Sequence, residues 1–551
     1  MTLLFGAVRL DPSAPAPAQD LFSIPQQLAA PPGTLDYRIH RDGAATLGYA
    51  VPRESLPSSP SATLYRSNDR SLLLIGQRDP VAGTDGGNEW RERLVERLSC
   101  GDTSALNLLS ANFSLALWDR AARRLVLARD QHGTASLFFR HRDRQIVFSS
   151  SLPFLLAQDG DEPEPDRLTT AFLLTGVSDQ DGSRTFYATM RQVPPGHLLE
   201  ADTRGPRLRR YWSPWDAAPV RFAREQDYVG AFTEVFDQAV ARGLDGAARP
   251  AILLSGGLDS GAVAVTAARQ LALRGGTLRA FTAVPAFDPE PYLPSTRCGD
   301  EREAAAAIAA NASNIEHRCL DTGPVTPLEG MREALGLLRH PIYGAANADW
   351  ILGLLRAARE AQADRLLTGQ CGNATISWSG SRVRAVRELF RRGDLGGLVA
   401  EWRGFAETRE TSALQTFKRV VLAALVPWEW LQQLRMGRYS EELLVHRSAL
   451  REDVGRELRL RERTREALRV AANPHHERHR DAILQSGVYS PNAFNARLAN
   501  AFGLTLEDPT SDWRVIEFCY GLPETAYAAR GQQRLLLRRA MAGKLPRDVL
   551  W

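Results

Sequence analysis

The chain contains one segment in which a short apolar run leads through a glycine loop into a helix: Ala251-Ile252-Leu253-Leu254-Ser255-Gly256-Gly257-Leu258-Asp259-Ser260-Gly261. The apolar run predicts a buried β-strand, and the small apolar residues at 262–267 predict the helix. This arrangement cradles phosphate, because consecutive glycines let the backbone approach an anion and the helix start directs its N–H groups toward it. Ser255 and Ser260 add hydroxyl donors. Asp259 would repel phosphate unless a cation lay between them, so we predict that it binds Mg²⁺.

The loop is not the common P-loop pattern, because no lysine follows its glycines. The string Ser-Gly-Gly-Leu-Asp-Ser instead resembles the pyrophosphate-binding loop of the ATP pyrophosphatases, and among them the asparagine synthetase family. The resemblance implies that ATP with Mg²⁺ adenylates a carboxylate, after which a nitrogen nucleophile displaces AMP. From spacing alone, an ordinary glycine turn before a helix is the alternative. The residues expected to bind the nucleotide here are Leu254, Ser255, Gly256, Gly257, Leu258, Asp259 and Ser260.

Composition bounds the class of protein. A length of 551 residues predicts more than one domain, and 44% hydrophobic with 24% charged residues is typical of a soluble globular chain. The net charge is only +4, and lysine occurs only at Lys418 and Lys544, so we expect no nucleic-acid partner. The five cysteines show no metal-binding spacing, which favours a reducing, cytoplasmic setting. No signal peptide and no transmembrane run is predicted.

Residues 1–215 are predicted to form an N-terminal domain, an antiparallel β-sandwich. Period-two alternation and short turns predict strands at residues 2–8, 71–76, 113–119, 124–129, 136–139 and 145–150. The segment between Asp11 and Pro60 is rich in proline, alanine and serine, so we expect long loops there.

Four strings in this half resemble the glutamine-amidotransferase domain of class B asparagine synthetases, namely residues 112–119, 127–139, 147–152 and 193–197. That resemblance implies an Ntn amidotransferase-like fold whose nucleophile is a cysteine directly after the initiator methionine. This chain has Thr2 there. It also has Ile75-Gly76-Gln77-Arg78 where the family carries Asn-Gly-Glu to hold glutamine. We therefore expect an inactive amidotransferase-like domain, with an active Thr2 as the alternative.

Residues 216–551 are predicted to form a doubly wound α/β synthetase domain with helical additions. Apolar residues at helical spacing predict a helix over residues 225–241, and residues 278–284 predict the next parallel strand. By resemblance, the backbone around Ala283 borders the adenine. Residues 300–303 open an alanine-rich helix with acidic side chains. Dipole capping and a role near the nucleotide both remain open for them.

A second motif follows at residues 363–378. Asparagine synthetases carry S-G-E-G-(S/A)-D-E here, and this chain has Thr368, Gly369, Gln370 and Asn373 at the Ser, Gly, Glu and Asp positions. The resemblance implies that Thr368 and Gly369 contact ATP, that the position of Gln370 works in the acyl site, and that the position of Asn373 helps to hold Mg²⁺, here only as a neutral oxygen donor. Gln370 cannot act as a general base, and the two amides together indicate an altered acyl substrate. The pattern G-Q-x-G-N-x-x-x-S-W resembles the lasso-peptide macrolactam cyclases, which also lack the N-terminal cysteine.

Three further predictions complete the site. Tyr343 or His340 could handle the proton of the attacking amine, and a packed Tyr with a surface His is the alternative. Arg534 occupies the position where the family has a transition-state lysine, with Lys544 as a fallback. Residues 381–480 are basic and predicted helical. They are either solvated helix faces or a lid that grips a peptide.

The sequence therefore predicts a lasso-peptide cyclase of the class B asparagine synthetase family. Such an enzyme adenylates an Asp or Glu side chain of a precursor peptide and closes a macrolactam with the N-terminal amine. The partners implied are the peptide, a leader peptidase and a leader-binding protein. Two alternatives stay open: a small-substrate enzyme (an ammonia-using asparagine synthetase or a β-lactam synthetase), and a catalytically inactive peptide-binding scaffold.

Overall fold

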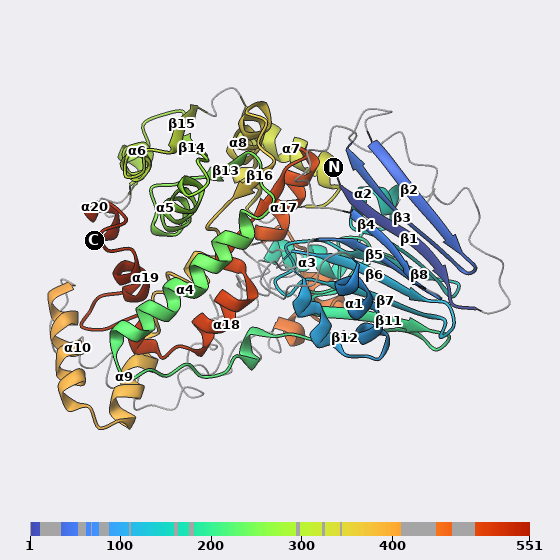
Figure 1. The fold of residues 1–551 in the computed structure, drawn as a ribbon, viewed down its shortest axis with the longest axis horizontal. Helices are drawn as coiled ribbons and strands as arrows, with labels where there is room; N and C mark the ends of the chain where they lie inside the picture. The colour runs from blue at the N-terminus through green and yellow to red at the C-terminus, as the bar shows by residue number, and fades with distance from the viewer. Residues whose placement is uncertain are drawn as a thin grey trace.

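The computed structural model divides the chain into a β-sandwich and an α/β region that lie side by side (Figure 1). It describes residues 2–11, 35–52, 62–67, 69–76, 88–109, 112–158, 163–175, 181–293, 298–321, 325–341, 344–408, 448–464 and 491–551.

Two six-stranded sheets form the N-terminal half, with the orders β10-β8-β9-β1-β3-β2 and β12-β11-β7-β6-β5-β4. Their strands are β1 (Leu3–Arg9), β2 (Leu35–Asp42), β3 (Ala45–Pro52), β4 (Ala62–Ser67), β5 (Arg70–Ile75), β6 (Ser114–Asp119), β7 (Arg124–Arg129), β8 (Phe138–Arg142), β9 (Gln145–Ser149), β10 (Arg191–Gln192), β11 (His197–Asp202) and β12 (Gly205–Arg210). Strands β6 and β7 pair antiparallel, as do β8 and β9, which confirms both predicted hairpins.

The sandwich has a helix on each outer face. Leu4 and Trp118 pack between the sheets, and both are fully buried. Helix α1 (Glu89–Ser99), followed by the 3-10 turn η2 (Thr103–Leu108), covers the second sheet through residues such as Leu94. Helix α2 (Leu152–Ala157) covers the first sheet through Phe154, whose ring lies 4.9 Å from that of Phe5. The predicted amidotransferase-like sandwich is confirmed, in a layered form that also buries both outer faces.

The expectation of long loops between Asp11 and Pro60 is wrong for residues 35–52, which form the β2–β3 pair. The turn contains Asp42-Gly43, and Gly43 has a φ of +56°, a conformation that glycine adopts without strain. An Asp-Gly pair between alternating residues is a hairpin signal, which the proline-rich surroundings obscured. The other residues of this segment, 12–34 and 53–60, lie outside the described residues.

A five-stranded parallel sheet, ordered β15-β14-β13-β16-β17, forms the centre of the second half. Its strands are β13 (Pro250–Leu253), β14 (Leu278–Val284), β15 (Ile315–Asp321), β16 (Arg365–Leu367) and β17 (Thr505–Glu507). The chain builds outward from β13 to β14 and β15, then returns to add β16 on the other side of β13. A ligand crevice is expected where the strand order reverses, at the carboxyl ends of β13 and β16.

Helices cover both faces of this sheet, so the predicted doubly wound arrangement is confirmed. Ile252 and Leu367 face the core shared with α4, α5 and α6, whereas Ala251 and Leu366 face α7, α8 and α17. The helices of this half are α4 (Glu225–Gly243), α5 (Leu258–Ala272), α6 (Arg302–Ala310), α7 (Pro327–Leu338), α8 (Ala348–Glu360), α9 (Arg382–Arg391), α10 (Leu395–Thr408), α14 (Glu452–Glu457), α17 (Pro491–Ala501), α18 (Trp513–Gly521), α19 (Leu535–Ala540) and α20 (Arg547–Leu550). Within the described residues, no helix is long and apolar enough to cross a membrane.

The basic helical region is described at residues 381–408 and 448–464. Helices α9 and α10 extend away from the sheet near α4 (Figure 1). Residues 448–464 instead contact the sandwich: Leu460 packs against α3 (Arg167–Thr175), and Arg167 donates two hydrogen bonds of 2.7 Å to Glu457. Three basic residues of this region, Arg465, His475 and His476, lie outside the described residues. The predicted boundary after residue 215 remains a prediction.

Candidate active site

The glycine loop lies at the carboxyl end of β13, and α5 begins at its end. The hydroxyls of Ser255 and Ser260 lie 2.9 Å apart, and the backbone N–H groups of Ser255 and Gly257 donate to the Ser260 and Ser255 hydroxyls. Gly257 is the N-cap of α5 and contributes no capping side chain. The first turn of the helix is therefore open to an anion at this edge of the sheet.

Gly256 allows the loop to touch the start of α6. A Cβ at this position would lie 2.7 Å from the Cβ of Ala304 and 3.2 Å from that of Glu301. The acidic start of α6 thus borders the glycine loop, as a role near the nucleotide would require. Glu301 is the N-cap of α6 and makes no side-chain capping hydrogen bond, while Glu303 lies in the first turn. Dipole capping and a role near the nucleotide both stay open for these residues.

The second motif packs directly on the first. A Cβ on Gly369 would lie 2.7 Å from the backbone of Asp259 and Ser260, and one on Gly372 would lie 2.2 Å from the Asp259 carboxylate. Both positions require glycine because the two loops are in contact. Strands β13 and β16 are neighbours in the sheet, so their following loops meet at its carboxyl edge.

Asp259 is the most perturbed carboxylate of the glycine loop. Burial raises its pKa to about 6, against the opposing effects of the Ser377 hydroxyl and the Arg534 guanidinium, while the nearby Asp508 raises it further. Its Oδ1 atom is buried and has no hydrogen-bond partner. A buried carboxylate oxygen without a partner fits a divalent cation.

No cluster of three or more His, Cys, Asp or Glu that could hold a metal occurs among the residues that the structure describes. Mg²⁺ commonly binds through one or two carboxylates together with substrate phosphates and waters. The single orphaned oxygen of Asp259 therefore suits a Mg²⁺ ion that arrives with ATP.

The two amides of the acyl site both have polar partners. The Oε1 atom of Gln370 accepts a hydrogen bond of 2.8 Å from the Nδ2 atom of Asn495 on α17. The Oδ1 atom of Asn373 accepts one of 3.2 Å from Arg534. Neutral side chains thus face neutral or cationic partners at the positions where the family carries two acids. The structure brings three predicted residues together here: Gln370, Asn373 and Arg534.

Arg534 is the N-cap of α19 and has a φ of +59°. Its charge lowers the pKa of both Asp259 and Arg538, so it lies near the candidate Mg²⁺ ligand and near a second guanidinium. The fallback, Lys544, lies elsewhere: its carbonyl accepts a hydrogen bond from Asn311, beyond the carboxyl end of α6. Of the two candidates, only Arg534 contacts the acyl-site motif.

Two predicted nucleotide contacts lie at the same sheet edge. Ala283 is the sixth residue of β14 and pairs with Leu320. The neighbouring Thr282 donates a hydrogen bond of 2.7 Å to the carbonyl of Leu254, which joins β14 to the glycine loop. The Thr368 backbone N–H donates to the Glu507 carbonyl, while its Oγ1 atom is buried and has no hydrogen-bond partner among the described residues.

Tyr343 lies outside the described residues, so its proposed role remains a prediction. The alternative of a surface His at 340 is wrong, because His340 is 2% exposed and its ring packs edge-on against Phe186 at 4.8 Å. Burial, followed by the charge of Arg497, holds the pKa of His340 well below its usual range. It is therefore a neutral ring packed at the domain boundary.

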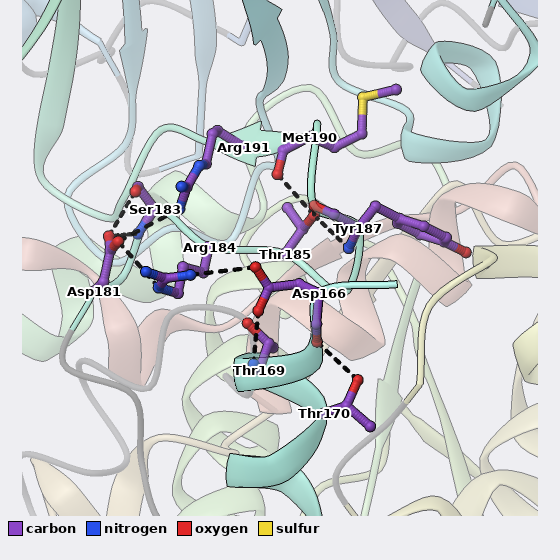
Figure 2. A network of polar contacts seen from close by, with 10 residues as sticks. All are labelled: Asp166, Thr169, Thr170, Asp181, Ser183, Arg184, Thr185, Tyr187, Met190 and Arg191. Atoms are coloured by element: carbon purple, nitrogen blue, oxygen red, sulfur yellow. Dashed lines mark hydrogen bonds and ion pairs between the residues drawn. The ribbon is translucent and has the colours of Figure 1, made fainter. Parts of the chain in front are cut away.

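A polar network braces the segment of the sandwich that carries Phe186. Asp166 accepts hydrogen bonds from the Thr169 backbone and from Arg184, at 2.7 and 3.2 Å (Figure 2). In the same segment, Tyr187 donates its hydroxyl to the carbonyl of Arg339, next to His340. The N-terminal domain thus fixes the backbone just before the Tyr343 region.

Sequence reasoning missed three residues beside the site: His132, Asn495 and Asp508. Asp508 caps the 3-10 turn η8 (Pro509–Ser511) and accepts a hydrogen bond of 2.9 Å from the backbone of Cys371. His132 belongs to the sandwich, and its Nε2 atom lies 3.4 Å from the sulfur of Cys371. An Asp-Pro-Thr string is a local capping signal that could have identified Asp508. The other two are brought in by tertiary packing, for which no local signal exists.

Thr2 stands where the amidotransferase-like domains that this half resembles carry a cysteine nucleophile. Thr2 is 6% exposed, and its backbone N–H donates to the Oδ1 atom of Asn500, whose amide donates back to the Thr2 carbonyl. Ile75 and Gly76, at the end of β5, line a cavity that Thr2 and Asn500 also line. The first residue after the initiator methionine is thus tied to α17 of the other domain.

The structure thus places a glycine loop, two amide side chains and the Arg534 guanidinium at the switch point of a parallel sheet. A family model described as asparagine synthase matches residues 231–551, and one described as a glutamine amidotransferase domain matches residues 92–212. The asparagine synthase model covers more than half of the chain. The protein belongs to the asparagine synthase family, whose members use ATP to form amide bonds.

Several characterised relatives are similar to this chain. Glutamine-hydrolyzing asparagine synthetase 3 of Bacillus subtilis (strain 168) is 22% identical over 480 residues, 84% of this chain and 68% of that protein. Asparagine synthetase 2 of the same organism is 27% identical over 168 residues, which cover 29% of this chain and 22% of that protein. Carboxyethyl-arginine β-lactam synthase of Streptomyces clavuligerus is 27% identical over 225 residues, 40% of each chain. The matched regions of the last two thus span less than half of each relative.

Proposed function

We propose that the protein is a macrolactam-forming enzyme of the lasso-peptide cyclase type. It adenylates an Asp or Glu side chain of a precursor peptide and closes a ring with the peptide's own N-terminal amine. The observation that carries the proposal is the pair of amide contacts, Gln370–Asn495 and Asn373–Arg534, beside an intact nucleotide loop. An acyl site with amides at the two positions where the family carries acids suits a substrate other than a free amino acid with its own charged groups.

The loss of the amidotransferase nucleophile supports the same proposal. Thr2 replaces cysteine and is bound to Asn500, and Ile75 replaces the asparagine expected next to Gly76. Ammonia from glutamine is then not the nucleophile, so the nitrogen comes from the acceptor itself. An amine on the same molecule as the carboxylate needs only correct positioning to react.

In the reaction, a carboxylate oxygen attacks the α-phosphorus of ATP, and the bond to the bridging oxygen breaks to release pyrophosphate. The glycine loop would hold the phosphates, and Arg534 would face the developing negative charge. Mg²⁺, held by Asp259, would offset phosphate charge when bound. The amine nitrogen then attacks the acyl carbon, AMP leaves with the bonding electrons, and the nitrogen loses its surplus proton. The residue that accepts this proton remains to be assigned, with Tyr343 as the candidate.

The partners follow from the proposed substrate: the precursor peptide, a leader peptidase that frees its N-terminus, and a leader-binding protein. We place the enzyme in the cytoplasm, where its five cysteines would stay reduced. The part of residues 381–480 that lies near α4 is the proposed peptide-gripping region.

A β-lactam synthetase is the second candidate, because the similarity to carboxyethyl-arginine β-lactam synthase covers 40% of both chains. Like the cyclase, such an enzyme joins an amine and a carboxylate of one molecule. An ammonia-using asparagine synthetase and an inactive scaffold are the other outcomes that a test must separate.

The test measures pyrophosphate and AMP release from Mg·ATP with a panel of acceptors. The acceptors are synthetic peptides with a free N-terminus and one Asp or Glu, the same peptides acetylated at the N-terminus, aspartate with ammonium, and a small β-amino acid. The proposal expects AMP release with the free peptides and amide product only from them. Turnover with aspartate and ammonium, or with the β-amino acid alone, would overturn it, as would no turnover with any acceptor.

A further inference from the structure

A cavity of about 110 Å³ lies between the two domains, away from the glycine loop. On the sandwich side it is lined by Thr2, Thr134 and Ser136, and on the synthetase side by Arg497 and Glu507. Liquid water occupies about 30 Å³ per molecule, so the space suits a few waters or one small organic molecule.

The charges around this cavity do not balance. Arg365 pairs with Glu507 at 2.9 Å, and Asn112 donates a hydrogen bond of 2.6 Å to the same carboxylate. Arg497 has no carboxylate partner among the described residues, and its Nε atom donates only to the carbonyl of Ala493, at 3.1 Å. Burial lowers the pKa of Arg497 to about 9, which leaves it charged at neutral pH. Arg497 is only partly exposed, and a cation that faces the cavity without a carboxylate partner in the described part of the chain favours an anion beside it.

Two buried hydroxyls also favour an anion in this cavity, because they can donate hydrogen bonds to it. The Oγ1 atom of Thr134 and the Oγ atom of Ser136 are buried without hydrogen-bond partners, and these residues are 3% and 7% exposed. Buried hydroxyls are nearly always hydrogen-bonded in folded proteins. Water could satisfy the hydroxyls, but it could not neutralise Arg497.

We propose that this cavity is a binding site for a small monocarboxylate, which pairs with Arg497 and accepts hydrogen bonds from Thr134 and Ser136. The occupant would bridge the two domains, since Arg497 lies on α17 and the hydroxyls belong to the sandwich. The site is separate from the proposed acyl site, and the inference does not rest on the proposed function.

The test is isothermal titration of the full-length protein with acetate at constant ionic strength, and with acetamide, which has a similar shape but no charge. We expect saturable acetate binding that is at least tenfold tighter than acetamide binding. Arg497→Gln should weaken acetate binding at least tenfold, Arg497→Lys should weaken it less, and Thr134→Val should weaken it severalfold. Arg269→Gln, which removes an exposed cation on α5, should leave it unchanged.

Thr134→Val keeps the proposal testable if Arg497→Gln fails to fold. Equal binding of acetate and acetamide, no binding of either, or acetate binding that both site variants leave intact would overturn the proposal. Binding of glutamine without binding of acetate would also overturn it, because it would indicate a retained glutamine pocket instead.

Discussion

At the scale of single residues, the site is built from a buried carboxylate and two amides. The Oδ1 atom of Asp259 is buried and has no hydrogen-bond partner among the described residues. Buried polar atoms nearly always have a partner, so this oxygen fits a bound cation. The sequence predicted Asp259, Gln370, Asn373 and Arg534 as site residues. In the structure Arg534 donates a hydrogen bond to Asn373, and the segment that carries Gln370 and Asn373 packs against Asp259. It could not predict Asn495, because the meeting of α17 with the second motif is a tertiary event.

Asp259→Asn tests the metal-binding role. The amide keeps the shape of the side chain but loses the charge, so pyrophosphate release should fall on the order of 100-fold or more. Because the variant removes a buried charge that has no partner, thermal stability without ATP should stay the same or rise. The matched control is Asp237→Asn, on the exposed salt bridge to Arg269. Wild-type turnover by Asp259→Asn would contradict this role.

His132 should make stability depend on pH. Burial and the charge of Arg129 lower its pKa to about 4 from an ordinary 6.5, and its other neighbour, Cys371, is a buried thiol whose pKa is raised. Between pH 6.5 and 4, His132 is therefore protonated in the unfolded chain and neutral in the folded chain. The free energy of unfolding falls as pH falls through this window. The full effect is about 3 kcal/mol.

The measurement is urea unfolding of wild type and His132→Asn at pH 7, 5.5 and 4. The variant should lose less stability than wild type on acidification, by up to about 3 kcal/mol. Parallel losses in the two proteins would show that His132 does not titrate in this window.

At the scale of elements, the sequence predicted the regular parts well because their patterns are local. The run at residues 250–253, the helix after Gly257 and the period-two strands β6 and β7 all follow directly from residue spacing. The β2–β3 hairpin was missed because its proline-rich flanks outweighed the Asp42-Gly43 turn. The contact between the two loops was also unpredictable, since it depends on β13 and β16 being neighbours despite more than 100 residues between them.

Gly372→Ala tests that loop contact. The added methyl group would lie 2.2 Å from the Asp259 carboxylate, so the loops must separate. We expect a loss of about 1–3 kcal/mol of stability and weaker ATP binding by equilibrium dialysis. The control is Gly336→Ala in α7, where nothing lies within 4 Å, and where alanine should stabilise the helix by up to about 1 kcal/mol. A Gly372→Ala protein with unchanged ATP affinity would argue against the contact.

At the scale of the whole molecule, the sandwich supports the synthetase domain at several points. Thr2 binds Asn500, His132 contacts Cys371, and the Trp212 side chain donates a hydrogen bond of 2.7 Å to Glu517. These contacts give the sandwich, which has no cysteine at position 2, a structural role beside the synthetase domain. No sequence pattern predicts this role, since it resides in contacts between residues more than 200 positions apart.

Thr2→Cys tests whether the nucleophile alone is missing. Restoring cysteine should produce no measurable glutamine hydrolysis, because Ile75 cannot replace the glutamine-binding asparagine and Asn500 still holds the backbone of residue 2. The measurement is glutamate release from glutamine, with and without Mg·ATP. Glutaminase activity in Thr2→Cys would mean that the domain retains a working glutamine pocket.

The most direct test of the central claim is the intact mass of the peptide product. Synthetic peptides with a free N-terminus and one Asp or Glu, moved through successive positions, are incubated with the full-length enzyme and Mg·ATP. The account predicts that at least one peptide becomes lighter by one water, with one AMP formed per product, and that its N-acetylated form does not change. Loss of water from the acetylated peptides, or AMP formation with no change in any peptide, would contradict it.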